Sequence, residues 1–189
     1  MKNIVLKSAL FAVAALALAA LLTFSLWILC SPQTMATASE RAGNYSFAVT
    51  CADLRFKYTN DSSDLARCAE DAILSGKDKH ILEYGEKLIS RTDFDEVCTN
   101  RNEKLSQGEY GQYTADYKSY ICGNVAAAEY RGGRLQTAVE TAGKAQSETA
   151  FIKLTLEVAA KGTDAEKGYL KTALTEKGYT NLVTYILEK

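Results

Sequence analysis

The chain has 189 residues, of which 47% are hydrophobic and 24% charged, and its 22 basic and 23 acidic side chains leave a net charge of −1. This balance excludes a strongly basic nucleic-acid-binding protein, because such proteins neutralise phosphates with clustered Lys and Arg. The single histidine, His80, excludes a metal site built from several histidines of one chain. The single proline and 12 glycines exclude collagen-like and Pro-rich classes.

An uncharged apolar stretch covers residues 8–29 and predicts a transmembrane helix. As a helix it spans about 33 Å, enough for a hydrocarbon core of about 30 Å. Lys2 and Lys7 precede it, and no acidic residue occurs before Glu40. The positive-inside rule therefore predicts cytoplasmic residues 1–7 and an extracytoplasmic remainder, with the membrane as one partner of the chain.

Two other interpretations of this segment remain open. Ala36-Thr37-Ala38 fits a small-x-small cleavage site, and cleavage near Ala38 would release a secreted protein that begins at Ser39. A lipoprotein signal ending at Cys30 is disfavoured, because bulky residues occupy positions 27–29. The apolar stretch exceeds a signal-peptide core of about 7–15 residues, which favours an uncleaved anchor. We then expect a linker over residues 30–39 and an extracytoplasmic domain over residues 40–189.

Helical periodicity dominates the rest of the chain, and no alternating strand pattern occurs. The predicted helices cover residues 40–58, residues 63–75 before Gly76, a segment from Asp78 to about residue 89, a segment beginning at Thr92, and residues 113–131 before Gly132 and Gly133. Further breaks are expected at residues 143–147, at Gly162 and at Gly178. Thr163 and Glu166 form a capping box, in which each side chain satisfies a backbone N–H of the other. The sequence predicts an all-α array of eight or nine short helices arranged as antiparallel hairpins.

Four cysteines follow the apolar segment, and an even number in an exported domain predicts two disulfides. In an antiparallel hairpin, residues equidistant from the turn face each other. Polar turns at residues 59–63 and 108–112 lie midway between Cys51 and Cys68 and between Cys98 and Cys122. We therefore expect the pairs Cys51–Cys68 and Cys98–Cys122, each worth roughly 3 kcal/mol in the chain-entropy account.

A short window, residues 126–145, resembles the tetratricopeptide repeat. Ala126 occupies the small-residue position of the first helix, Gly133 the turn, and Leu135, Ala138 and Ala145 the packing positions of the second helix. Short disulfide-containing helical repeats are a related family. The resemblance implies an array of helix pairs that binds other proteins.

Five tyrosines provide the candidate binding face. Tyr110, Tyr113, Tyr117 and Tyr120 recur at spacings that share one side of a helix, and Tyr130 returns to about the same side. Such a stripe suits a groove that binds a peptide or a glycan. The alternative is that these rings pack against the next helix and only their hydroxyls reach water.

No catalytic, metal or cofactor motif is found. The sequence has no Walker loop, EF-hand, G-x-S-x-G or H-E-x-x-H pattern, so we expect no cofactor and no metal. His80 lies at a predicted helix start, where a solvated histidine is common. Asp93, Asp95 and Glu96 lie at the start of the next predicted helix, after Thr92, where they complement its dipole.

The leading hypothesis is therefore a membrane-anchored extracytoplasmic helical scaffold that binds a protein partner, as an adaptor or assembly factor. A second hypothesis is a cleaved, secreted helical protein with a tyrosine-lined groove. The third is an envelope enzyme with two carboxylates, which requires a cleft holding a carboxyl group of raised pKa.

Overall fold

The computed structural model describes residues 2–106 and 116–187 of the chain, with the side chains of residues 10–103 and 116–186. All regular secondary structure within them is helical, which confirms the all-α prediction. The helices are α1 (Lys2–Cys30), α2 (Pro32–Arg41), α3 (Tyr45–Thr59), α4 (Ser62–Ser75), α5 (Asp78–Ile89), α6 (Phe94–Ser106), α7 (Tyr117–Arg131), α8 (Leu135–Gly143), the 3-10 helix η1 (Glu148–Phe151), α9 (Ile152–Lys161), α10 (Asp164–Glu176) and α11 (Thr180–Leu187).

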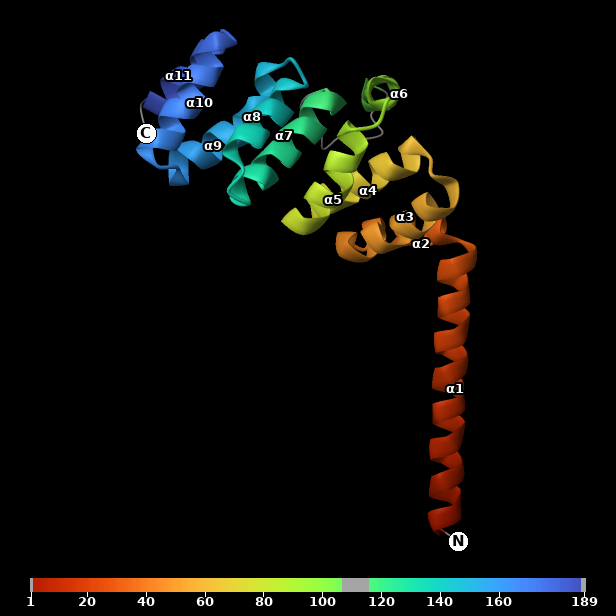
Figure 1. Ribbon diagram of the computed structural model, residues 1–189. Helices are drawn as coiled ribbons and strands as arrows, with labels where there is room; N and C mark the ends of the chain where they lie inside the picture. Colours follow the sequence, from red (N-terminus) through yellow and green to blue (C-terminus); the bar gives the residue numbers. More distant parts are fainter. Residues whose placement is uncertain (1, 107–115, 188–189) are drawn as a thin grey trace.

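The helices after α1 form an elongated array in which neighbours in sequence are mainly neighbours in space (Figure 1). α2 packs on α3, α3 on α4 and α4 on α5, and the order continues through α7 and α8 to the pair α10 and α11. α6 lies beside this line and contacts α4 and α7. α1 leaves the array at the α2 end and projects away from it.

Four helix pairs share one turn geometry, with a glycine in the left-handed region followed by a single residue before the next helix. Gly43, Gly76, Gly133 and Gly178 have φ between 67° and 77° and connect α2 to α3, α4 to α5, α7 to α8 and α10 to α11. A Cβ is disfavoured in this conformation, so glycine allows the tight reversal. The spacing between the four glycines is unequal, and the longest interval contains α6.

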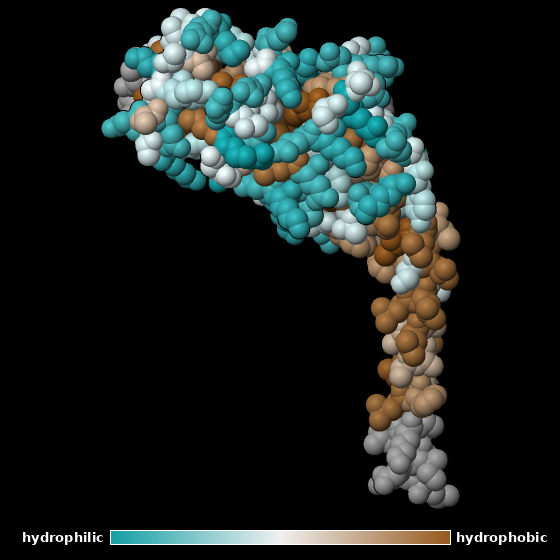
Figure 2. All heavy atoms as spheres, viewed as in Figure 1, coloured by the Kyte–Doolittle hydropathy of each residue, from teal (hydrophilic) through white to brown (hydrophobic). Residues whose placement is uncertain are grey.

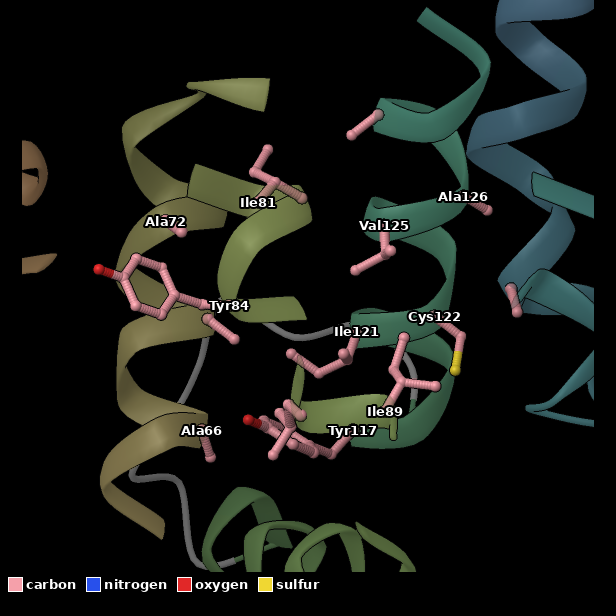
Figure 3. Packing of buried hydrophobic residues seen from close by; sticks show 14 of the residues in the cluster. Ala66, Ala72, Ile81, Tyr84, Ile89, Tyr117, Ile121, Cys122, Val125 and Ala126 are labelled. Carbon is pink, nitrogen blue, oxygen red and sulfur yellow. The ribbon is translucent and has the colours of Figure 1, made fainter. Parts of the chain in front are cut away.

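Small side chains let the helices approach closely. A Cβ on Gly85 of α5 would lie 2.3 Å from Cγ2 of Val125, so α5 lies directly against α7. Figure 3 shows Ile121 and Val125 on the side of α7 that faces α5, and Cys122 and Ala126 on the opposite side. Residues on both sides of α7 are fully buried, because α5 covers one side and α8, η1 and α9 lie across the other.

The predicted linker over residues 30–39 is a helix in the structure. α2 buries Met35, Ala36 and Ser39 against the array, and only Ser31 separates it from α1. Arg67 of α4 donates from Nε to Glu40 (2.8 Å) and from Nη2 to Thr37 (2.7 Å). Helix α2 therefore packs with the array, and the first predicted helix, residues 40–58, corresponds to α3 preceded by the end of α2 and the α2–α3 turn.

The apolar helix α1 is uncovered over most of its length. The segment Leu10–Cys30 is long and apolar enough to cross a membrane or to serve as a signal sequence, and none of its 18-residue window is buried. Leu10 is 63% exposed and Phe11 81% exposed. Figure 2 shows this helix as a hydrophobic column that ends where the hydrophilic surface of the array begins. At its C-terminal end Phe24 stacks on Phe47 of α3, and Ile28 packs against the core.

Met35→Ala tests whether α2 belongs to the folded core. We expect this variant to lower the free energy of unfolding by roughly 2–4 kcal/mol, because it removes a buried side chain and leaves a cavity. Chemical denaturation of the full chain in detergent micelles measures the change. Thr34→Ala, at an exposed position of the same helix, is the control. Equal stability of the two variants would mean that residues 30–39 are a linker after all.

Gly133→Ala and Gly168→Ala test the effect of backbone conformation at two glycines where an added methyl group is not crowded. Neither added Cβ meets an atom within 4 Å, but Gly133 has φ +77° and Gly168 lies inside α10. We expect Gly133→Ala to destabilise the fold by about 1 kcal/mol, because it forces a side chain into the left-handed region. Gly168→Ala should stabilise it by about 0.5–1 kcal/mol through helix propensity. Thermal melts of both variants check the signs, and a stabilising Gly133→Ala would refute the turn assignment.

Candidate functional site

Two open grooves lie on either side of α8. The first, of about 880 Å³, lies between α5 and the start of α8 and is lined by Lys79, Leu82, Glu83, Glu86, Lys87, Ser90 and Arg134. The second, of about 550 Å³, lies between α8 and α10 and is lined by Val139, Glu140, Gly143, Lys144, Tyr169, Ala173, Glu176 and Lys177. Each groove therefore runs between helices of successive pairs, and each combines both charge signs with apolar side chains.

Ion pairs and cation–π contacts orient the cations of these grooves. In the first groove, Nη2 of Arg134 lies 2.6 Å from Oε1 of Glu86, which links α8 to α5. Nζ of Lys87 lies 4.4 Å above the ring centre of Phe56. In the second, Nζ of Lys177 lies 5.9 Å from the ring centre of Phe151. These contacts orient the side chains of Arg134, Lys87 and Lys177.

The tyrosines of the predicted binding face that the structure describes lie in different surroundings. Tyr117 is buried and donates from its hydroxyl to Oε1 of Glu70 at 2.8 Å, so this ring belongs to the core. Tyr120 and Tyr130 are half-buried and pack against the core. Tyr110 and Tyr113 lie outside the described residues. The exposed tyrosine in a groove is instead Tyr169 of α10, which is 44% exposed.

The cysteines are all free thiols, so neither predicted disulfide, Cys51–Cys68 or Cys98–Cys122, is present in the structure. The prediction placed the first pair correctly in the α3–α4 hairpin, since both residues are buried there. Two residues at equal distance from a turn lie opposite each other along the axis of a hairpin. This distance does not set the direction of their Cβ atoms, which a disulfide also requires.

Burial is the main influence on the four thiols of the array. Burial and then the charge of Asp71 raise the pKa of the Cys51 thiol, whereas burial and then Asp53 raise the pKa of Cys68. Cys98 and Cys122 lie close enough for burial and their mutual interaction to raise the pKa of Cys98 to about 12. Burial raises the pKa of Cys122 to about 12 as well. Protonated, buried thiols of this kind are poor nucleophiles.

A buried polar network joins α4, α6 and α7. Glu70 is buried in α4, accepts the Tyr117 hydroxyl and lies 3.4 Å from Nε of Arg101. Burial raises the pKa of Glu70, and the Arg101 charge opposes the rise. Arg101 also donates from Nη2 to the Ser63 carbonyl at 3.0 Å. The network therefore ties α6 to the array by hydrogen bonds and charge, which leave Glu70 inaccessible to a ligand.

A carboxyl pair lies where α2 meets α4. Asp71 is only 2% exposed, and its Oδ2 has no hydrogen-bond partner within the described part of the chain. Burial, then the charge of Glu40, raises the pKa of Asp71 to about 8, and a hydrogen bond between the two carboxyl groups adds to the rise. Arg67 opposes this rise. Asp71 therefore keeps its proton near neutral pH, but it lies inside the helix packing and outside both grooves.

The sequence analysis did not identify Glu70 and Asp71 as buried, because it assigned α4 a single buried face. α4 contacts α3, α5, α6 and α7, so positions on nearly all of its sides are covered. The signal available was an alanine-rich helix, in which adjacent Glu70 and Asp71 are flanked by Ala69 and Ala72. Small residues on several faces indicate a central helix, and acidic residues within such a helix are then expected to be buried.

The remaining candidate residues do not form a cluster with recognisable chemistry. The His80 ring stacks on Tyr84, and Nδ1 lies 3.9 Å from Oε2 of Glu83 on the same helix. Asp93 accepts a hydrogen bond from the Ser62 hydroxyl at 2.9 Å, and Asp95 pairs with Lys118 at 2.7 Å. Within the described residues, no group of three or more His, Cys, Asp or Glu is placed to hold a metal ion.

No family model, no curated protein and no solved structure matches this chain. The resemblance of residues 126–145 to the tetratricopeptide repeat therefore stays a prediction. In the structure Ala126 and Ala138 are buried, Leu135 and Ala145 pack against the core, and Gly133 forms the turn between α7 and α8.

Asp71→Asn tests the carboxyl pair through the pH dependence of stability. The folded chain keeps a proton on Asp71 up to about pH 8, whereas an unfolded chain releases it near the ordinary value of 3.8. Stability from this group is therefore fully present below that value and is lost as the pH rises through about 8. We expect the unfolding midpoint of the full chain to fall between pH 5 and 8, and this fall to be smaller in Asp71→Asn.

Denaturation of the full chain in detergent at several pH values measures the difference. The exposed Asp164→Asn is the control and should keep the wild-type slope. If Asp71→Asn also keeps that slope, Asp71 is ionised in the folded state at neutral pH.

Proposed function

We propose that the protein is a single-pass, membrane-anchored helical scaffold whose array binds a partner polypeptide on the extracytoplasmic side. The observation that carries the proposal is the contrast between α1 and α2. α1 leaves its apolar side chains uncovered, whereas α2, one residue later, is built into the core of the array. An uncovered apolar helix of this length needs a bilayer to bury it, and the array supplies no other cover.

The orientation follows from charge. Lys2 and Lys7 precede the apolar segment, which favours a cytoplasmic N-terminus and an exported array. The cysteines do not oppose this location, because Cys51, Cys68, Cys98 and Cys122 are buried and shielded as thiols. The exposed Cys30 lies at the end of the span.

The position of α2 favours a retained anchor over a cleaved signal. The bond between Ala38 and Ser39 lies inside α2, and Ser39 is buried. Cleavage there would remove Met35, Ala36 and the Thr37 hydroxyl that accepts a hydrogen bond from Arg67. A mature protein that began at Ser39 would lose most of a core helix, so we propose that α1 stays attached.

The grooves beside α8 support polypeptide binding. Each groove carries side chains of both charges, which suits neither a phosphate backbone nor a metal ion. Leu82 in the first groove and Tyr169 and Ala173 in the second supply apolar contact area between the charges. Repeated helix pairs with left-handed glycine turns at Gly43, Gly76, Gly133 and Gly178 agree with a tetratricopeptide-like array, and we propose that relation for the chain as a whole.

Site-specific photo-crosslinking in membranes of the native host tests the partner. A benzophenone amino acid in place of Tyr169, in the second groove, or of Lys79, in the first, should give one discrete crosslinked species in common. The same substitution at Tyr58, which is 73% exposed on α3 and lies outside both grooves, is the matched control. We expect no such species from position 58, because a bound chain would follow the grooves beside α8.

Two results would refute the proposal. One is the absence of crosslinks from positions 79 and 169 in repeated trials, and the other is an equal pattern from position 58. Intact-mass analysis of the same sample reports the N-terminus. A chain beginning at Met1 supports the anchor, whereas one beginning at Ser39 would favour the secreted alternative.

A further inference from the structure

The length of α1 fixes where the outer surface of a bilayer would lie. The candidate span Leu10–Cys30 has 21 residues. At about 1.5 Å per residue it is about 31 Å long, which equals a hydrocarbon core of about 30 Å. Lys7 limits any shift toward the N-terminus. The span therefore has almost no spare length, and the outer edge of the hydrocarbon lies close to Cys30.

The array touches α1 below that edge. The ring of Phe24 stacks on Phe47 of α3, with centroids 6.3 Å apart and planes 12° from parallel. Phe24 lies about 9 Å short of Cys30 along the helix axis, at about 1.5 Å per residue. The ring of Phe47 therefore lies at the depth of the outer acyl carbons, and the first turn of α3 that carries it lies at the boundary between acyl chains and headgroups. Figure 1 shows α2 and α3 as the part of the array next to α1.

The side chains at this place suit a headgroup layer. Arg41 and Asn44 are exposed at the α2–α3 turn, and Tyr45 and Phe47 are half-exposed in the first turn of α3. No acidic residue occurs in residues 41–50. Aromatic rings collect at membrane interfaces, and cations pair with lipid phosphates there. Trp27, 49% exposed, lies at the same end of α1.

We propose that the α2–α3 hairpin, through residues 41–47, is seated in the phospholipid headgroup layer. The array then lies on the membrane surface instead of standing away from it on a free tether. Phe24 and Phe47 form the contact that fixes the angle between the span and the hairpin. This inference rests on the proposed function, because it requires α1 to cross the bilayer.

Tryptophan quenching in the full chain tests the proposal. Trp27 is the single tryptophan, so Trp27→Phe gives a background without indole signal. In that background, Phe47→Trp reports the hairpin and Tyr169→Trp reports the far groove. The proteins are reconstituted in phosphatidylcholine–phosphatidylglycerol nanodiscs, with or without lipids brominated near the headgroup end of their acyl chains. Iodide in the buffer is the aqueous quencher.

We expect the indole at position 47 to lose emission to the brominated lipids and to be shielded from iodide. The indole at position 169 should show the reverse. If position 47 responds to iodide as strongly as position 169 and not to bromine, the hairpin is clear of the membrane and the inference is wrong. Shielding from both quenchers would also overturn it, since a second protein copy would then cover the site.

The natural Trp27 separates this inference from the proposed anchor. Bromine quenching of Trp27 without quenching at position 47 would leave the anchor standing and refute the seated hairpin. A Trp27 that no brominated lipid quenches would refute the anchor itself. Tyr45→Trp, in the same turn but outside the Phe24–Phe47 stack, repeats the measurement if Phe47→Trp unfolds in thermal melts.

Discussion

The hydrogen bonds from Arg67 to α2 decide how the apolar helix α1 is joined to the rest of the molecule. The Nε and Nη2 atoms of Arg67 bind Glu40 and Thr37, which lie on one face of α2, so the guanidinium sets both the position and the rotation of that helix. Burial of Met35 and Ala36 supplies the apolar part of the attachment. With α2 fixed, the Phe24–Phe47 stack and the short connection at Ser31 set the direction in which α1 leaves the array.

Local signals predicted much of the fold, because helix ends are encoded by nearby residues. Gly76 ends α4 in the left-handed conformation, as its place in the sequence indicated. The Thr163–Glu166 capping box is present with both of its hydrogen bonds. The apolar segment forms a single uncovered helix that ends at Cys30. Each of these features depends on a few consecutive residues, so the sequence alone was sufficient.

Features that depend on distant contacts were missed. α2 is polar in sequence and resembles a linker, and its helix is held by Arg67 from a different part of the chain. Cys51 and Cys68 lie in the predicted hairpin, but their rotation depends on how α3 and α4 pack, so the disulfide prediction failed. For Tyr117 both a binding face and packing on a neighbouring helix were considered. Its hydroxyl donates to the buried Glu70, a partner that the sequence did not indicate. Pairings of this kind follow from tertiary packing, which periodicity does not specify.

The serial order of the helix pairs has a mechanical consequence. If a membrane holds α1 and a partner pulls at α8 or α10, as we propose, tension would pass from α2 through each helix interface in turn, because packing is mainly between neighbours. In such a series, the weakest interface sets the force at which the chain extends. Arg131 of α7 pairs with Asp78 of α5 and Glu157 of α9 and so reinforces the middle of the line. α6 lies beside the load path and would carry little of the tension.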